Sequence, residues 1–94
     1  MTVDVRVRAF ATLRDPLGRP EVELAVSKGA AVSDALAALE AEYPGLSGKL
    51  LDDGEIPSTV TVLRNGRRVP GTDPETVELA DGDELVLAPP VTGG

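Results

Sequence analysis

Apolar and polar residues alternate along two early stretches of the chain. Val3, Val5, Val7 and Ala9 occupy every second position in residues 2–9, and Val22, Leu24 and Val26 repeat the pattern in residues 21–26. A period of two, filled largely by β-branched residues, predicts strands with one buried face. The intervening segment RDPLGRP contains the turn residues Pro and Gly. We therefore predict that a short polar loop joins the two strands into a hairpin.

The spacing of apolar residues lengthens between residues 28 and 45, where it fits one face of an α-helix. The stripe consists of Val32, Ala35, Leu36, Leu39 and Tyr43. Recurrence at three- and four-residue intervals, in a segment rich in Ala, Leu and Glu, predicts a helix. Ser33 or Asp34 is expected to cap its start. The Pro44-Gly45 pair is expected to end it.

The second half of the chain predicts a short helical turn, followed by strands and tight turns. The helical turn, in residues 46–51, is expected to bury Leu46, Leu50 and Leu51. Strand character returns in residues 58–69, where Asn65-Gly66 favours a tight turn. Residues 76–88 predict a short strand, a turn at Asp81-Gly82 and a final strand over residues 83–88.

These elements follow the order strand, strand, helix, short turn, strand, short strand, strand. One helix is enough to cover one face of one small mixed sheet, so the predicted fold class is α+β, with four to five strands. The first and last strands are both apolar and alternating, and we expect them to be neighbours at the sheet centre. We predict a domain over residues 1–88 and a flexible tail over residues 89–94.

The chain's 94 residues carry a formal charge of −7 and include neither Cys nor His. An acidic protein repels nucleic acid and anionic membrane surfaces, so we expect it to bind neither directly. The sequence contains no disulfide, signal-peptide or membrane-span pattern, which leads us to expect a cytoplasmic location. Without Cys or His, the chain can form neither a usual zinc site nor a Cys–His pair or Ser–His–Asp triad. We predict no metal site and no enzymatic activity of the isolated chain.

Two acidic clusters have simple structural interpretations. Asp52, Asp53 and Glu55 lack the spacing and the final Glu of a calcium loop, and we interpret them as part of a solvated loop. Asp81 and Asp83 lie on either side of a glycine, which is more typical of a turn than of paired catalytic carboxylates. Neither cluster predicts an active site.

Two stretches carry a family resemblance. The first is VTVLRNGRRV, residues 60–69, which is similar to a strand–turn segment of a family named below. The second is DGDELVLAPPVTGG, residues 81–94, which is similar to the sequence that closes the members of the same family. The second is the more specific, because it combines a turn, a strand, two prolines and Gly-Gly in fixed order. With the order of elements, these stretches resemble the MoaD/ThiS sulfur carriers. That group has the ubiquitin-like β-grasp fold and includes the archaeal ubiquitin-like small modifiers.

The resemblance implies that the C-terminal carboxylate, here that of Gly94, is the reacting group. In such proteins an E1-like adenylyltransferase (MoeB/ThiF-like) uses ATP to adenylate this carboxylate, and the adenylate is converted to a thiocarboxylate. A sulfur-acceptor enzyme, such as the large subunit of molybdopterin synthase, then takes the sulfur. The chain would act as a protein co-substrate, or as the small subunit of such a synthase, and would hold no cofactor of its own.

The composition of the tail agrees with this role. Pro89 and Pro90 favour an extended, semi-rigid exit, and side-chain-free Gly93 and Gly94 let an enclosing pocket approach closely. We expect Val91-Thr92, with both prolines, to contact the partner. Ubiquitin-like modifiers often place a basic residue at the Val91-Thr92 position, which makes ubiquitin-type conjugation machinery a poorer match. Read without the preceding strand, the tail would be an ordinary frayed end.

Because alternate side chains of a strand point to opposite faces of the sheet, the sequence also predicts a partner surface. Residues expected to face the helix are Val5, Val7, Val60, Val62, Leu85 and Leu87. Phe10, Leu63 and Val86 then face away from the helix and form a candidate docking patch. The alternative is that they are isolated exposed apolar residues, which are common on protein surfaces. A β-bulge would also change which face of the sheet the side chains of a strand point to. The three arginines near Asn65-Gly66, at residues 64, 67 and 68, are interpreted as solvated surface, with pairing to a partner's acidic groups as the alternative.

Several functions share the same activated carboxylate. The leading hypothesis is a sulfur carrier for molybdopterin synthesis. Similar carriers serve tRNA thiolation, cysteine, thiamine thiazole and natural-product synthesis, and the partner chooses the acceptor. The second hypothesis is a ubiquitin-like protein modifier that joins Gly94 to a target lysine. The third is a binding module with an inert tail.

Overall fold

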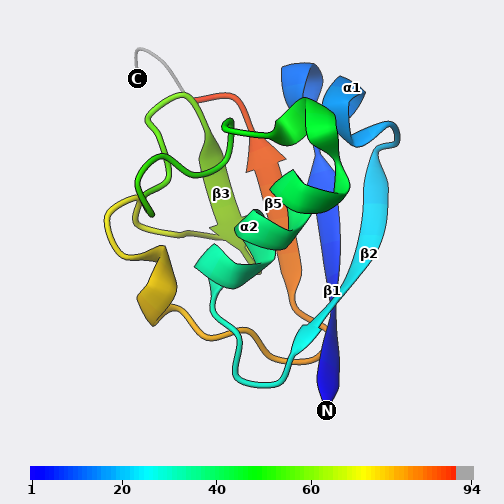
Figure 1. Cartoon of the computed structure of the whole chain (residues 1–94), viewed down its shortest axis with the longest axis vertical. Helices are drawn as coiled ribbons and strands as arrows, with labels where there is room; N and C mark the ends of the chain where they lie inside the picture. Colours follow the sequence, from blue (N-terminus) through cyan, green and yellow to red (C-terminus); the bar gives the residue numbers. More distant parts are fainter. Residues whose placement is uncertain (91–94) are drawn as a thin grey trace.

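A five-stranded mixed sheet with one long helix across one face forms the body of the protein (Figure 1). The computed structural model describes residues 1–90. The strands are β1 (Thr2–Ala9), β2 (Glu21–Ser27), β3 (Thr61–Arg64), β4 (Arg67–Arg68) and β5 (Glu84–Ala88). The helices are α1 (Arg14–Leu17) and α2 (Val32–Glu42), with 3-10 helices at Ala11–Leu13, Pro44–Leu46 and Pro74–Thr76. The predicted α+β class, mixed sheet and single main helix are confirmed.

The strands lie in the order β2-β1-β5-β3-β4. β1 is antiparallel to β2 and parallel to β5, and β5 is antiparallel to β3. The expectation that the first and last strands are central neighbours is therefore correct. Because β5 has a strand on each side, the segment that leads into the C-terminal tail is hydrogen-bonded on both of its edges.

The core lies between α2 and the sheet face that it covers. Val5 and Val7 of β1, and Leu85 and Leu87 of β5, are fully buried. They meet Val32, Ala35, Leu36 and Leu39, four of the five residues of the predicted helix stripe, whereas Tyr43 follows the helix and is only partly buried. All six residues predicted to face the helix are buried. Burying one such Val or Leu side chain contributes roughly 1.5–3 kcal/mol, so the core fixes which face each strand presents.

The ends of α2 differ slightly from the prediction. The residue before the helix is Ala31, which has no capping side chain. Instead, the Asp34 carboxylate in the first turn accepts a hydrogen bond from the Ala31 backbone N–H at 2.8 Å. Asp34 therefore satisfies a free backbone donor from inside the helix, and Ser33 is not the cap. The helix ends before Tyr43, and a 3-10 turn starts at Pro44 as expected from the proline.

The connection between β1 and β2 is not the short polar loop that we predicted. It holds a 3-10 helix and α1, and it buries Leu13 and Leu17 in the core. Gly18 ends α1 with φ of 83°, a left-handed conformation that glycine adopts without steric cost. The prediction failed because Pro and Gly marked the turn but did not reveal that leucines between the strands would close one end of the core.

Two further predictions need correction. Residues 76–79 do not form a strand: Thr76 is the last residue of a 3-10 helix, and the segment makes one isolated bridge, between Glu78 and Ala31. The short strand of the sheet is β4, directly after the Asn65-Gly66 turn. In the segment 46–51, Leu46 and Leu50 are fully buried, but Leu51 is only half-buried. Over residues 1–90, no helix is long and apolar enough to cross a membrane.

Candidate functional site

Strand β5 starts at a hydrogen-bonded network centred on Asp83. This carboxylate is only 7% exposed. It accepts hydrogen bonds from the Ala80 backbone N–H at 2.8 Å, from Arg64 Nε at 2.9 Å and from Asn65 Nδ2 at 2.9 Å. Burial alone would raise the pKa of Asp83, but the hydrogen bonds from Ala80, Asn65 and Arg64, with the Arg64 charge, outweigh it and lower the pKa below its ordinary value.

The Asn65-Gly66 turn locks the same end of the strand. The Asn65 side-chain oxygen accepts from the Glu84 N–H at 2.9 Å, while the Asn65 backbone N–H donates to the Glu84 carbonyl at 2.9 Å. Both turn residues have positive φ, 50° and 85°, as a tight hairpin turn with right-handed twist requires. Arg64 is therefore committed to an internal ion pair, and of the three nearby arginines only Arg67 and Arg68 are exposed.

The Asp81–Asp83 pair is turn chemistry, as predicted. The Asp81 carboxylate accepts a hydrogen bond from the Asp4 backbone N–H at 2.8 Å, which ties the turn before β5 to β1. Each carboxylate of the pair has a structural partner, so neither is poised as an acid or base. Among residues 1–90, no group of three or more acidic side chains is placed to hold a metal ion.

The other end of β5 leads out of the sheet. The Leu87 carbonyl accepts a hydrogen bond from the Phe10 N–H at 3.0 Å, and Ala88 pairs with Thr61 of β3. Pro89 and Pro90 follow directly, the first half-buried and the second exposed. Proline has no N–H to continue a ladder, so pairing stops here and the chain leaves the sheet. The predicted tail contacts Val91 and Thr92, and the predicted reacting residues Gly93 and Gly94, lie outside the described residues.

The predicted docking residues Phe10, Leu63 and Val86, here called the outer-face patch, lie near this exit and are not covered by α2. Leu63 and Val86 are opposite one another on adjacent strands, and both are half-buried. Phe10 follows the end of β1 and is 38% exposed. It is one of the two large apolar side chains that the described residues expose, the other being Met1.

Charged groups border the outer-face patch on one side. Arg8 pairs with Val86 across the β1–β5 ladder, and its guanidinium carbon lies 5.6 Å from the centre of the Phe10 ring. The same guanidinium is 3.8 Å from Glu84 and 3.7 Å from Glu21. This side therefore presents apolar surface next to a cation held between two carboxylates. Such a mixture of aromatic, apolar and Arg groups is typical of protein interfaces.

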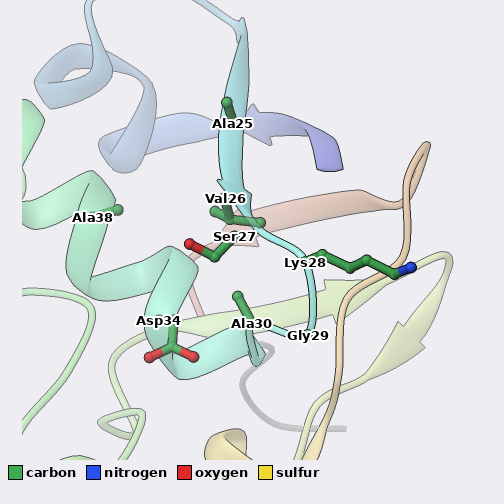
Figure 2. A pocket seen from close by; sticks show the side chains of 8 residues that line it. All are labelled: Ala25, Val26, Ser27, Lys28, Gly29, Ala30, Asp34 and Ala38. Carbon is green, nitrogen blue, oxygen red and sulfur yellow. The ribbon is translucent and has the colours of Figure 1, made fainter. Parts of the chain in front are cut away.

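A groove that the sequence analysis missed lies between β2 and the start of α2 (Figure 2). Its volume is about 550 Å³, and residues of β2, of the following turn and of α2 line it. Figure 2 shows Val26 and Ser27 on one side and Asp34 and Ala38 on the other. No periodic pattern marks it, because small residues at a sheet edge give no signal of their own.

The ThiS family model matches residues 7–94. Two curated relatives come from Haloferax volcanii. Small archaeal modifier protein 3 is 44% identical over 98% of this chain and 100% of its own length. Small archaeal modifier protein 1 is 40% identical over 93% of this chain and 97% of its own length.

Solved structures extend the similarity to the fold. The solution structure of the HVO 2177 protein of Haloferax volcanii has a TM-score of 0.86 and 44% identity, and the match covers 99% of this chain and 88% of that one. The putative molybdopterin converting factor subunit 1 of Pyrococcus furiosus has a TM-score of 0.80 and 28% identity, with coverage of 95% and 99%. A complex of BexX and CysO from Amycolatopsis orientalis has a TM-score of 0.75 and 27% identity, with coverage of 96% and 99%. The ubiquitin-like β-grasp fold is confirmed, and a member of the group is seen with a partner protein.

Proposed function

The chain belongs to the ThiS family, and we propose that it is a sulfur carrier whose Gly94 carboxylate is adenylated and then converted to a thiocarboxylate. The geometry of β5 carries the proposal. This strand is paired on both edges, is anchored at its start by Asp83 and is followed by two prolines, which cannot extend the pairing. The family match also extends to Gly94. A protein co-substrate needs this combination of a fixed body and a terminus presented to another protein's active site.

The chemistry takes place on the main chain. A carboxylate is a poor electrophile, so its oxygen attacks the α-phosphorus of ATP, pyrophosphate leaves, and an acyl-adenylate forms. Hydrosulfide then adds to the activated carbonyl and AMP leaves with the C–O bond electrons, which gives the thiocarboxylate. An E1-like adenylyltransferase supplies the ATP site. This chain supplies the carboxylate, at the end of a backbone segment whose glycines have no side chains to block its entry into that site.

The outer-face patch is proposed as the docking surface for the activating enzyme. It lies on the sheet face opposite α2, beside the strand end that carries the tail. Docking there fixes the body while the tail enters the pocket, which raises the local concentration of the carboxylate at ATP. Val91, Thr92 and the two prolines are proposed to contact the enclosing pocket, and Gly93 to pass its narrowest part.

The acceptor that we propose is the large subunit of molybdopterin synthase, for which this chain would be the small subunit. Support comes from the similarity to a protein named as a molybdopterin converting factor subunit. The names of the two curated relatives favour a second candidate, a ubiquitin-like modifier that forms an isopeptide bond between Gly94 and a target lysine. Both candidates begin with the same adenylate, and they differ in whether sulfide or an amine attacks it.

The experiment that tests the shared first step is ATP–pyrophosphate exchange with an activating enzyme from the same cell. Exchange is expected with the full chain and is expected to be lost when Gly93 and Gly94 are deleted. A matched control adds one alanine after Gly94, which keeps both glycines but misplaces the carboxylate. Undiminished exchange with the deleted chain would contradict the proposal. High-mass conjugates in cell extracts that need both glycines would select the modifier over the carrier.

A further inference from the structure

We propose that the groove between β2 and α2 binds an extended, basic segment of a partner protein, which adds to the sheet as a strand beside β2. The site is separate from the outer-face patch and from the tail. The proposal combines the open edge of β2, the shape of the groove and the charges around it. It does not depend on the proposed sulfur chemistry.

The hydrogen bonding of β2 leaves one set of backbone groups facing outward. The Lys28 N–H donates to the Met1 carbonyl and the Ala9 N–H donates to the Pro20 carbonyl, each at 3.0 Å. In the antiparallel β1–β2 register, these bonds place the N–H and C=O groups of the even-numbered β2 residues toward β1. The odd-numbered residues, including Glu23 and Ala25, therefore face the open edge. The Ser27 carbonyl there accepts the Ala30 N–H at 2.9 Å, and within residues 1–90 no strand pairs with this edge.

The two edges of the sheet differ in how they are protected. β4, at one edge, has two residues, and both are exposed arginines. Short length and charge are common ways to prevent further pairing. β2, at the other edge, has seven residues and contains neither proline nor lysine. Its helix-facing side chains are all apolar, so the edge is a template for another strand.

The groove has room for the side chains of an added strand. Alternate side chains of such a strand point toward the helix layer, where Val26 and Ala38 form apolar walls and Ser27 and Ala30 leave space. The volume of about 550 Å³ exceeds that of one medium-sized side chain. Backbone bonds to β2 would provide the affinity and this groove the selectivity, as in other strand-addition complexes.

Charge selects the occupant. Asp34 is exposed, and its Oδ2 atom accepts a hydrogen bond from the Ala31 N–H. Glu23 is exposed on the edge strand itself, while the nearby Arg6 pairs with Glu21 at 3.8 Å. Lys28 also lines the groove, but its side chain extends away from Asp34 (Figure 2). A second copy would bring the same carboxylates and another charge of −7, whereas a basic segment complements them.

The groove and the tail exit are at opposite ends of the sheet. Residues 25–27 of β2 pair with residues 2–4 at the start of β1, whereas the end of β1 at Ala9 pairs with Leu87 near the exit. A strand bound beside β2 would therefore leave the outer-face patch and the tail accessible. One partner is able to hold the protein while another acts on its terminus.

A titration of the isotope-labelled full chain with the blocked peptide Lys-Val-Lys-Val-Thr-Val-Lys tests the proposal. Amide NMR shifts are expected in residues 21–30 and 34–38, with none at Leu63 or Val86. The same peptide with N-methyl groups on alternate backbone nitrogens cannot pair with the edge and is expected not to bind. A peptide with Glu in place of Lys is expected to bind at least about tenfold more weakly.

A matched pair of variants locates the site on the protein. Ala38→Gln fills the groove and is expected to weaken binding at least about tenfold, whereas Ala37→Gln, one residue away and exposed, should change it less than about twofold. Equal binding of the N-methylated peptide to the unchanged protein would overturn the proposal, as would shifts confined to the outer-face patch or no shifts at all. Shifts of β2 amides with protein concentration alone would overturn it in favour of a second copy.

Discussion

The two ends of β5 have opposite chemistry. At its start, Asp83 is buried and holds Ala80, Arg64 and Asn65 through charged or polar hydrogen bonds. At its end, two prolines stop the pairing near half-buried apolar side chains on the sheet face that α2 does not cover. The network at the first end stabilises the strand, and the apolar surface at the second is available to a partner. A change at the start should therefore alter stability, and a change at the end should alter recognition.

The largest effect is expected for Asp83→Ala. The substitution leaves the Ala80 N–H, Arg64 and Asn65 without their shared acceptor, and the free energy of unfolding should fall by about 2 kcal/mol. Urea denaturation measures this change. Asp81→Ala is the control, because Asp81 is exposed and accepts one hydrogen bond, and it should cost clearly less. At temperatures where Asp83→Ala is folded, ATP–pyrophosphate exchange should match that of the unchanged chain.

Leu63→Ala tests the other end. Truncating this half-buried residue of the outer-face patch should reduce kcat/KM for activation about tenfold, mainly because KM rises. Arg67→Ala, an exposed change in the adjacent strand β4, serves as control and should have little effect. An unchanged KM for Leu63→Ala would remove the outer-face patch from the proposed docking surface.

Stability should also depend on acidic pH through Asp83. Because the folded-state pKa of Asp83 is below its ordinary value, the carboxylate stabilises the fold at pH above about 4. This contribution should be lost progressively as pH falls from there through the folded-state pKa. The difference in unfolding free energy between the unchanged chain and Asp83→Asn should narrow over that range. A constant difference at acidic pH would show that the charge of Asp83 does not stabilise the fold.

The smallest effect is expected when Pro89 and Pro90 are both replaced by alanine. The strand before them is already paired on both edges, so stability should be unchanged. A more flexible exit should raise the KM for the activating enzyme about two- to fivefold, because more chain entropy is lost on docking. A fall in kcat that is larger than this rise in KM would mean that the prolines position the carboxylate during the reaction itself.

The sequence predicted those parts of the fold that a regular period encodes. Alternation identified β1, β2 and the inward faces of β3 and β5, and the helical stripe identified α2. Leu13 and Leu17 were missed, because residues in short irregular helices have no period to detect. The segment near Glu78 was predicted as a strand on propensity alone, but tertiary contacts gave it only one bridge.

The candidate site was predictable to different depths. The order of turn, strand, prolines and glycines predicted the tail as the reacting segment. The alternation of side chains along the strands predicted that Leu63 and Val86 lie on the sheet face away from the helix. The network around Asp83 was not predicted, because it joins residues almost twenty positions apart through side-chain geometry that no local pattern encodes. The groove beside Ala38 was missed for a similar reason, since it is the space between a strand edge and a helix.

The most direct test of the central claim is the mass of the intact chain after incubation with its activating enzyme, ATP and sulfide. We predict a mass increase equal to the difference between one sulfur and one oxygen atom, and fragmentation should place it on Gly94. The enzyme's activity should be verified in the same mixture by pyrophosphate release. An unmodified terminal carboxylate under those conditions, or sulfur at any other residue, would contradict the proposed role as a sulfur carrier.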